Sequence, residues 1–458
     1  MMPEVVIIGA GISGLTVGFF LKKAGWAPLI LEADAEVGGT MKSRLIDGFL
    51  VEYGPNSALE TTPLFRQLFE ETGISSEVTY ANPAASRRYI LRDGRLHPLP
   101  LHPLAFLRSS LWSFRGKVRV LMEPFQPRGQ VEESVAQFVR RRLGQELLDY
   151  AINPFVAGVY AGDPEQLSIR YAFPKVFALE EKYGGLILGA LRGRKERARR
   201  DETAKVSAAM FSFRQGMGTL PRALASYLSG TIRLKTTARA ISFSEGRFLV
   251  AAECEGKAET IPADILVVST PAYRAAELVR GLSESLAETL ARIPYPPVAE
   301  VVFGYRQEQM GIPLDGFGFL VPEKERRRVL GTIWNSAIFP NRAPSGYVEL
   351  TTFVGGARSP ELVGVSDREL IEIVAGELAE IMKISGRPDF VYITRWDRAI
   401  PQYTLGYGRV LEALEGAERS YPGLYFVANY RGGIAVGDCV RSARATAERI
   451  ERGLAGKT

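Results

Sequence analysis

Cysteine and histidine are scarce in this chain of 458 residues, which contains two of each. Cys254 and Cys439 stand alone in the sequence, so we expect neither a disulfide framework nor a cysteine-ligated zinc site. His97 and His102 lie beside prolines, and we expect them in a surface loop rather than in a metal site or a nucleophilic triad. The composition therefore predicts no metal and suggests that any chemistry depends on a bound cofactor.

Long apolar runs are also absent, since none reaches the roughly eighteen residues that a membrane-spanning helix needs. Glu4 interrupts the N-terminal apolar segment, so we expect no signal peptide and a cytoplasmic protein, with room for peripheral contact at the cytoplasmic face of a membrane. The net charge of +6 fits an anionic substrate or an anionic surface. The basic run over 192–200 has no interleaved aromatic residues, which predicts a solvated loop and no nucleic-acid partner.

Glycines are abundant, and three of them form a fingerprint close to the N-terminus, in the run VVIIGAGISGL. Gly9, Gly11 and Gly14 follow a strand-like segment and precede a helical pattern over 13–25, and a second strand ends on Glu32. Such glycines permit a tight turn, close approach to a pyrophosphate and close packing of helix on strand, while the acid binds a ribose hydroxyl. The spacing predicts a dinucleotide-binding βαβ unit.

A second glycine pair, Gly38-Gly39, follows the ribose acid, and this favours an extended flavin dinucleotide over NAD. The segment 424–450 reads as a strand, a glycine-rich loop and a helix whose N-terminus would point at the flavin. Strands are predicted over 206–271, with a hairpin around Glu245-Gly246, and helices over most of 97–205. Within the helical region, residues 104–125 combine tryptophan, phenylalanine and basic side chains, which suits either a membrane interface or a packed helix.

Stretches along nearly the whole chain resemble the FAD-dependent amine oxidase superfamily and, within it, the protoporphyrinogen oxidases. The most specific are GFLVEYGPNS (48–57), INPFVAGVYAGDPEQLS (152–168), DGFGFLVPEKERRRVLGTI (315–333) and GGIAVGDCVRSAR (432–444). The resemblance and the pattern together predict an α/β fold with three parts: a Rossmann-like FAD-binding domain over 1–80, 206–290 and 405–458, a mixed-sheet substrate domain over 81–96 and 291–404, and a mainly helical, membrane-associating domain over 97–205.

The resemblance also implies the residues of the site. The implied FAD contacts are Gly9, Ala10, Gly11, Ile12, Ser13, Gly14, Glu32, Gly39, Thr40, Gly54, Pro55, Asn56, Ser57, Ala238, Trp396, Asn429, Ile434, Ala435 and Val436. The implied substrate contacts are Asn56, Arg88, Gly158, Leu320, Ile333 and Phe353. In this scheme the Arg88 guanidinium holds a propionate, the two aliphatic side chains clamp a flat macrocycle, and the Phe353 ring stacks on a pyrrole.

The function implied by the resemblance is oxidation of protoporphyrinogen IX to protoporphyrin IX, with hydride transfer to FAD and oxygen as the electron acceptor. No side chain is assigned as a catalytic acid or base, because the cofactor performs the chemistry. Oxidation of coproporphyrinogen III remains an alternative, as does a non-catalytic lipid-handling protein on the same fold. An amine oxidase is disfavoured by Thr40, since those enzymes often carry arginine there, although Tyr403 and Tyr430 could serve as its aromatic pair. A homodimer is a further expectation.

Overall fold

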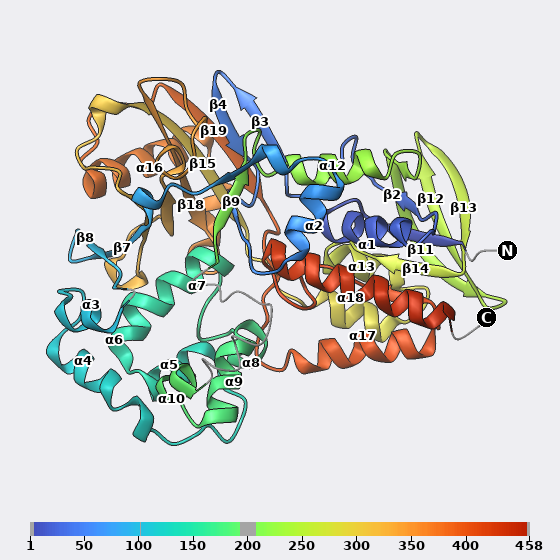
Figure 1. The fold of residues 1–458 in the computed structure, drawn as a ribbon, viewed down its shortest axis with the longest axis horizontal. Coiled ribbons are helices and arrows are strands. Elements are labelled where there is room, and N and C mark those ends of the chain that lie inside the picture. The colour runs from blue at the N-terminus through green and yellow to red at the C-terminus, as the bar shows by residue number, and fades with distance from the viewer. Residues whose placement is uncertain (1–3, 101, 193–207, 456–458) are drawn as a thin grey trace.

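The computed structural model describes residues 4–100, 102–192 and 208–455, which form an α/β fold in three visible parts (Figure 1). Of the basic run over 192–200, all but the first residue lies outside the described residues. Among the described residues, no helix is both long and apolar enough to cross a membrane.

A five-stranded parallel sheet forms the centre of the nucleotide-binding part, in the strand order β10–β2–β1–β14–β20. Its strands are β1 (Val5–Ile8), β2 (Leu29–Leu31), β10 (Ile232–Arg233), β14 (Ile265–Val268) and β20 (Leu424–Phe426). All four residues of β1 and of β14 are buried, as expected for parallel strands covered on both faces. The strand and helix predicted at the N-terminus are therefore confirmed, since α1 (Ile12–Lys23) follows β1 directly.

Helices cover both faces of this parallel sheet. On one face lie α1, α2 (Leu64–Glu71), α12 (Thr219–Tyr227) and the long C-terminal helix α18 (Val436–Ala455), which runs beside α1 (Figure 1). On the other face lie α13 (Ala272–Val279), α14 (Glu284–Ala291) and α17 (Gly408–Ser420). The helix predicted near the C-terminus is confirmed, and it starts one residue before Gly437.

Three small sheets connect or flank these layers. They are the hairpin β3 (Ser43–Ile46) with β4 (Phe49–Glu52); the sheet of β5 (Ala58–Leu59), β9 (Met210–Phe213) and β6 (Val78–Tyr80); and the antiparallel sheet of β11 (Thr236–Ser244), β12 (Arg247–Cys254) and β13 (Lys257–Ala263). The predicted hairpin turn is confirmed at Glu245 and Gly246, whose φ angles of 53° and 79° are those that a two-residue hairpin turn requires.

A seven-stranded mixed sheet forms the second part, at the upper left of Figure 1, in the order β19–β15–β18–β17–β16–β7–β8. The strands are β7 (Arg87–Arg92), β8 (Arg95–Pro98), β15 (Val298–Arg306), β16 (Gly316–Leu320), β17 (Gly331–Ile333), β18 (Tyr347–Gly355) and β19 (Phe390–Trp396). Only the β7–β16 pair is parallel. Helix α16 (Asp367–Met382) packs on one face of this sheet, and β4 packs against the other face at its β15–β19 end.

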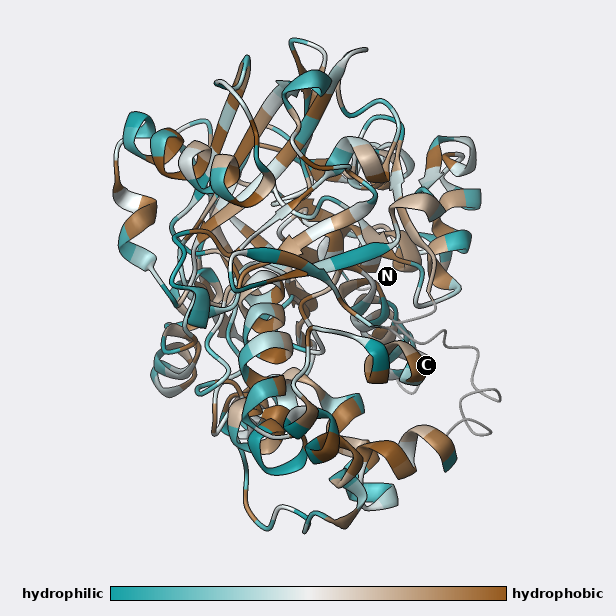
Figure 2. Cartoon of the chain, turned by 90° about the vertical axis from the view of Figure 1, so that its left-hand side faces the viewer, coloured by the Kyte–Doolittle hydropathy of each residue, from teal (hydrophilic) through white to brown (hydrophobic). Residues whose placement is uncertain are grey.

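The third part is helical and occupies the lower left of Figure 1. It contains α3 (Pro103–Arg108), α4 (Phe114–Leu121), α5 (Val135–Arg142), α6 (Gln145–Leu147), α7 (Asn153–Tyr160), α8 (Ile169–Ala172), α9 (Pro174–Tyr183) and α10 (Leu186–Arg192). Figure 2 shows this part at the bottom of the molecule, with hydrophobic helical turns at its outer end. The prediction of a mostly helical region over 97–205 holds for its described residues.

The stretch 104–125 is not one amphipathic helix, because Ser113 caps a new helix, its hydroxyl accepting from Gly116 N. Trp112, the residue that most suggested a membrane interface, is 5% exposed and packs in a cluster with Ile90 and Tyr150. The exposed apolar side chains of this stretch are instead Leu104, Leu107, Phe114, Val118, Leu121, Met122 and Phe125.

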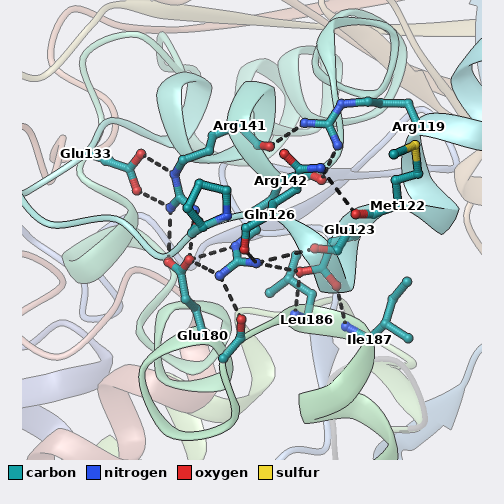
Figure 3. A network of polar contacts seen from close by, with 12 residues as sticks. Arg119, Met122, Glu123, Gln126, Glu133, Arg141, Arg142, Glu180, Leu186 and Ile187 are labelled. Atoms are coloured by element: carbon teal, nitrogen blue, oxygen red, sulfur yellow. Dashed lines mark hydrogen bonds and ion pairs between the residues drawn. The ribbon is translucent and has the colours of Figure 1, made fainter.

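A buried network of charges holds the segment after α4 against α5, α9 and α10 (Figure 3). Arg142 is fully buried, and its Nε donates to Glu180 Oε1 at 2.7 Å. Glu123, also fully buried, accepts from Leu186 N at 2.8 Å and from Ile187 N at 3.0 Å, so its carboxylate caps the first turn of α10. The network therefore fixes the base of the surface formed by residues 104–125.

Candidate functional site

The turn between β1 and α1 has the geometry of an anion site. Gly9 has a φ of +103°, and a Cβ on Gly14 would lie 2.1 Å from the Gly9 carbonyl oxygen, so both positions exclude larger residues. A Cβ on Gly11 would meet no atom within 4 Å, which means that open space lies in front of the turn. No side chain caps the twelve-residue helix α1, so its first N–H groups are available to a phosphate.

Glu32 stands at the end of β2 and is tied to the same turn. Its carboxylate accepts from Ala10 N at 2.7 Å and from Asp34 N at 2.9 Å. Burial raises the pKa of Glu32, and these two hydrogen bonds offset part of that rise. Because each carboxylate oxygen has a second lone pair, both can still accept from a ribose hydroxyl.

Ala238 and Gly39 lie beside this acid and this turn. Thr236 N donates to the Glu32 carbonyl oxygen at 2.8 Å, which starts β11 next to the acid, and Ala238 follows at the edge of a bulge. A Cβ on Gly39 would lie 3.6 Å from the Cα of Gly11. The structure thus places the implied adenine, ribose and pyrophosphate contacts together.

The implied flavin contacts after β4 also meet one another. A Cβ on Gly54 would lie 2.5 Å from the Thr40 carbonyl oxygen, and the Trp396 indole Nε1 donates to Tyr53 O at 2.8 Å. Asn56 is 8% exposed, and its amide Nδ2 donates to Gly54 O at 3.2 Å while Oδ1 is buried without a partner. An unpaired buried acceptor is costly, so Asn56 is suited to accept from a bound group with N–H donors, such as a flavin ring.

Tyr403 positions the C-terminal glycine-rich loop and was not predicted to do so. Its hydroxyl donates to Asn429 O at 2.8 Å and accepts from Gly433 N at 3.0 Å, so one side chain joins both ends of the loop that leads to residues 434–436. Tyr430 is 0% exposed and lines no open space, so these two tyrosines form no open aromatic pair of the kind an amine oxidase would need. The sequence suggested that Tyr403 would act through its aromatic ring. In the structure it acts through its hydroxyl, which holds the glycine-rich loop.

The mixed sheet brings most of the implied substrate contacts onto one face. In one row across the strands, Arg88 is opposite Gly318, which is opposite Ile333. In the next row, two residues along each strand, Leu320 is opposite Gly331, which is opposite Phe353. Residues that are opposite or two apart share a face of a sheet, so these four side chains project on the side away from α16.

Gly158 brings the helical part against this face. It lies in α7, and a Cβ there would be 2.4 Å from Cδ2 of Leu320. The two implied contacts therefore touch, although they are more than 150 residues apart in sequence. Asn56 belongs to the flavin side instead, where its only described hydrogen bond is the local one to Gly54.

Arg88 is a half-buried cation that, among the described residues, forms no ion pair. Its guanidinium lies 5.8 Å from the centre of the Phe317 ring, and burial lowers the pKa of Arg88. Its neighbours differ, since Arg87 pairs with Asp315 and Arg92 with Glu146. A desolvated guanidinium without an acid is suited to a carboxylate ligand.

Three buried acids near this face were not predicted. Glu52 in β4 pairs with the buried Arg342 at 2.7 Å, whereas Glu300 in β15 and Glu349 in β18 form no ion pair with a described residue. Burial is the main cause that raises the pKa of Glu300 and that of Glu349, each to about 8. The signal in the sequence was an acid inside an apolar strand, as in PPVAEVVF.

Comparison with known proteins gives a consistent result. The family model of flavin-containing amine oxidoreductases matches residues 12–451. Protoporphyrinogen oxidase 2, chloroplastic/mitochondrial, of Arabidopsis thaliana is 32% identical over 98% of this chain and 93% of its own length. Coproporphyrinogen III oxidase of Bacillus subtilis (strain 168) is 30% identical over 96% of each chain. A crystal structure from Exiguobacterium sp. 255-15 superposes with a TM-score of 0.81 at 27% identity, covering 98% of this chain and 99% of its own.

Proposed function

The chain belongs to the flavin-containing amine oxidoreductase family, and on that premise we propose that it oxidises protoporphyrinogen IX to protoporphyrin IX with oxygen as the electron acceptor. It is an oxidoreductase and uses FAD, which the residues of the β1–α1 turn, Glu32 and Asn56 fit. Bound FAD would supply the redox chemistry, as an acceptor of hydride and a donor of electrons to oxygen. These relatives do not support the non-catalytic alternative.

The chain's own residues would bind and orient the macrocycle. The Arg88 guanidinium would hold a propionate, while Leu320 and Ile333 contact the macrocycle and the Phe353 ring stacks on a pyrrole. Gly158 lets the backbone of α7 approach closely, so that its carbonyl can accept from a pyrrole N–H. Holding the reacting carbon in one orientation lowers the entropic part of the barrier.

The half-buried, unpaired guanidinium of Arg88 is the observation that carries this proposal. Protoporphyrinogen IX has two propionates and coproporphyrinogen III has four, so the second substrate calls for more unpaired cations. The neighbouring Arg87 and Arg92 are already paired with Asp315 and Glu146. A single unpaired guanidinium on this strand favours the substrate with fewer carboxylates.

Coproporphyrinogen III is the second candidate, because the Bacillus subtilis relative matches 96% of the chain. The test supplies purified flavin-loaded protein with each porphyrinogen and follows porphyrin fluorescence. We expect a higher kcat/KM for protoporphyrinogen IX. A higher value for coproporphyrinogen III would overturn the choice of substrate, and no turnover of either would overturn the proposed function.

Contact with an anionic membrane surface is the second part of the proposal. Phe114 and Phe125 are 79% and 82% exposed, and the basic Arg108, Arg115 and Lys117 lie along the same segment. Exposed aromatic and apolar side chains beside cations are typical of segments that lie in a membrane interface. Location at the cytoplasmic face of a membrane would follow, and a homodimer is a separate hypothesis that sedimentation would test.

Replacing both phenylalanines, Phe114→Ser with Phe125→Ser, should weaken binding to vesicles of anionic phospholipid by at least about tenfold. A fully buried phenylalanine contributes about 1.5–3 kcal/mol, so losing two exceeds the 1.4 kcal/mol of a tenfold change. Co-sedimentation measures this, with Leu45→Ser as the control, because Leu45 is 71% exposed in the distant β3 hairpin. Equal binding of the three proteins, or no binding by the wild type, would contradict membrane contact through 104–125.

A further inference from the structure

Glu300 is a buried carboxyl group that belongs to neither the implied FAD contacts nor the implied substrate contacts. It lies in β15, is 5% exposed, and is the only charged residue among 298–305. Its oxygen Oε2 is buried and has no hydrogen-bond partner. An unpaired buried carboxyl oxygen destabilises a fold, so its presence calls for a functional explanation.

The position of Glu300 joins the two halves of the site. In the register of the mixed sheet it is opposite Phe353 on one side and Thr394 on the other, so it projects from the face that carries the implied substrate contacts. The Trp396 indole N–H, which also donates to Tyr53 O, interacts with the Glu300 carboxyl. Tyr53 directly precedes the 54–57 segment expected to contact the flavin.

The charges around Glu300 leave it without a counter-ion among the described residues. Burial raises the pKa of Glu300 to about 8, the Glu52 carboxylate adds to the rise, and the Trp396 N–H offsets part of it. The charge of Glu52 is in turn balanced by the buried Arg342, which binds Glu52 and Ser212. The other titratable groups on the same face of β15, β18 and β19 are Arg306, Tyr347, Glu349 and Tyr392, and the Tyr392 hydroxyl is hydrogen-bonded to that of Tyr53.

We propose that Glu300 is the general base that takes up the nitrogen proton which the macrocycle loses during its oxidation. The inference rests on the proposed function. In each of the three two-electron oxidations a meso C–H bond breaks and its hydrogen leaves as hydride to the flavin. In two of them an N–H bond also breaks and its proton forms an O–H bond on the carboxylate. In the third, the proton that reaches the carboxylate through nitrogen is replaced there by one shifted from a meso carbon, so that four C–H and two N–H hydrogens are lost in all. Reduction of oxygen to hydrogen peroxide consumes two electrons and two protons, and the Glu300 proton is one of these.

The environment suits this role. General base catalysis is most efficient when the pKa of the base lies near the working pH, because the base is then both strong and partly ionised. The Glu300 carboxyl has no cation beside it and little contact with solvent, and both features bring its pKa closer to the working pH. The unpaired Oε2 is the atom that would accept the proton.

The first test measures the rate of flavin reduction by protoporphyrinogen IX without oxygen, as a function of pH. We expect the wild-type rate to rise with pH through a transition near 8, since only the ionised carboxylate accepts a proton. Glu300→Gln should be at least about 10²-fold slower and show no such transition. Glu349→Gln is the matched control, because Glu349 is also buried, with a carboxyl that accepts from Asn335 Nδ2 at 2.8 Å. A Glu300→Gln protein with wild-type rates and pH profile would overturn the proposal.

The second test needs no turnover. The absorption spectrum of the bound flavin is titrated between pH 6 and 9 in the absence of substrate, and a charge that appears beside the flavin should shift it. We expect a transition near pH 8 in the wild type and in Glu349→Gln but not in Glu300→Gln. Lack of a transition in the wild type would overturn the proposal without any variant. If the wild type oxidises neither porphyrinogen, the proposed function fails, while this titration still shows whether Glu300 ionises beside the cofactor.

Discussion

Among single residues, Arg88 is the one on which substrate binding should depend most directly. Replacing it with alanine removes a charge-assisted contact, which contributes about 1.5–3 kcal/mol, so we expect KM for the porphyrinogen to rise by about 10- to 100-fold. Flavin content should change little, because Arg88 lies in β7 and not in a segment expected to bind FAD. Steady-state kinetics and the flavin absorbance of the purified protein measure the two effects.

The matched control is Arg87→Ala in the same strand, because Arg87 is exposed and already pairs with Asp315. Surface ion pairs contribute about 0–1 kcal/mol, so this variant should behave like the wild type. Unchanged kinetics of Arg88→Ala, or equal effects of both substitutions, would remove Arg88 from the site.

Gly11 allows a similar test of the cofactor site. Its φ of −72° is open to any residue, and a Cβ there meets no protein atom within 4 Å, so Gly11→Ala should fold normally. The added methyl group would project into the space expected for the pyrophosphate, so we expect at least about tenfold weaker FAD binding. Gly376→Ala in α16 is the control, since a Cβ at that site also meets nothing. Flavin retention after dialysis measures the difference, and equal retention would refute the placement of the pyrophosphate.

At the scale of helices, the buried network around Arg142 should determine how firmly the helical part is held together. Burial on its own would raise the pKa of Glu180, but hydrogen bonds from Arg141 and Arg142 outweigh it and lower that pKa. A carboxyl whose folded-state pKa is lowered contributes stability above its unfolded pKa of about 4.3, and loses this contribution as the pH falls through the folded pKa.

Glu180→Gln should therefore destabilise the protein at pH 7, by about 3 kcal/mol, because it leaves the Arg142 charge partly uncompensated in the interior. The gap in melting temperature between variant and wild type should narrow as the pH falls below about 4. Thermal unfolding at pH 7 and below pH 4 measures the difference in melting temperature. Glu415→Gln in α17 is the control, because Glu415 is exposed. A gap that stays constant with pH would contradict the role of the ionised Glu180.

For the whole molecule, the parts that could be predicted are those with a local signal. The β1–α1 turn needs only Gly9, Gly11 and Gly14 at fixed spacing, and the structure places Glu32 beside them. The substrate face could not be derived in this way, because it depends on the register between strands that lie far apart in the sequence, from β7 to β18. The resemblance supplied those residues, and the sheet explains why they belong together.

Other features depend on packing that no local pattern records. Trp112 is buried because it packs against Ile90 and Tyr150, which lie far from it in the sequence. Tyr403 acts through its hydroxyl on a loop about thirty residues away in sequence. Glu300 was missed because a single acid in an apolar strand acquires meaning only once its neighbours, Trp396 and Phe353, are known.

The central claim is that FAD bound to this chain oxidises a porphyrinogen held on the face that carries Arg88 and Phe353. The most direct measurement mixes the purified, flavin-loaded protein with protoporphyrinogen IX in the absence of oxygen and follows flavin absorbance and porphyrin fluorescence together. The account predicts that flavin absorbance bleaches as the macrocycle is oxidised, and that it recovers when oxygen is admitted. Flavin that stays oxidised in the presence of the porphyrinogen would contradict the account.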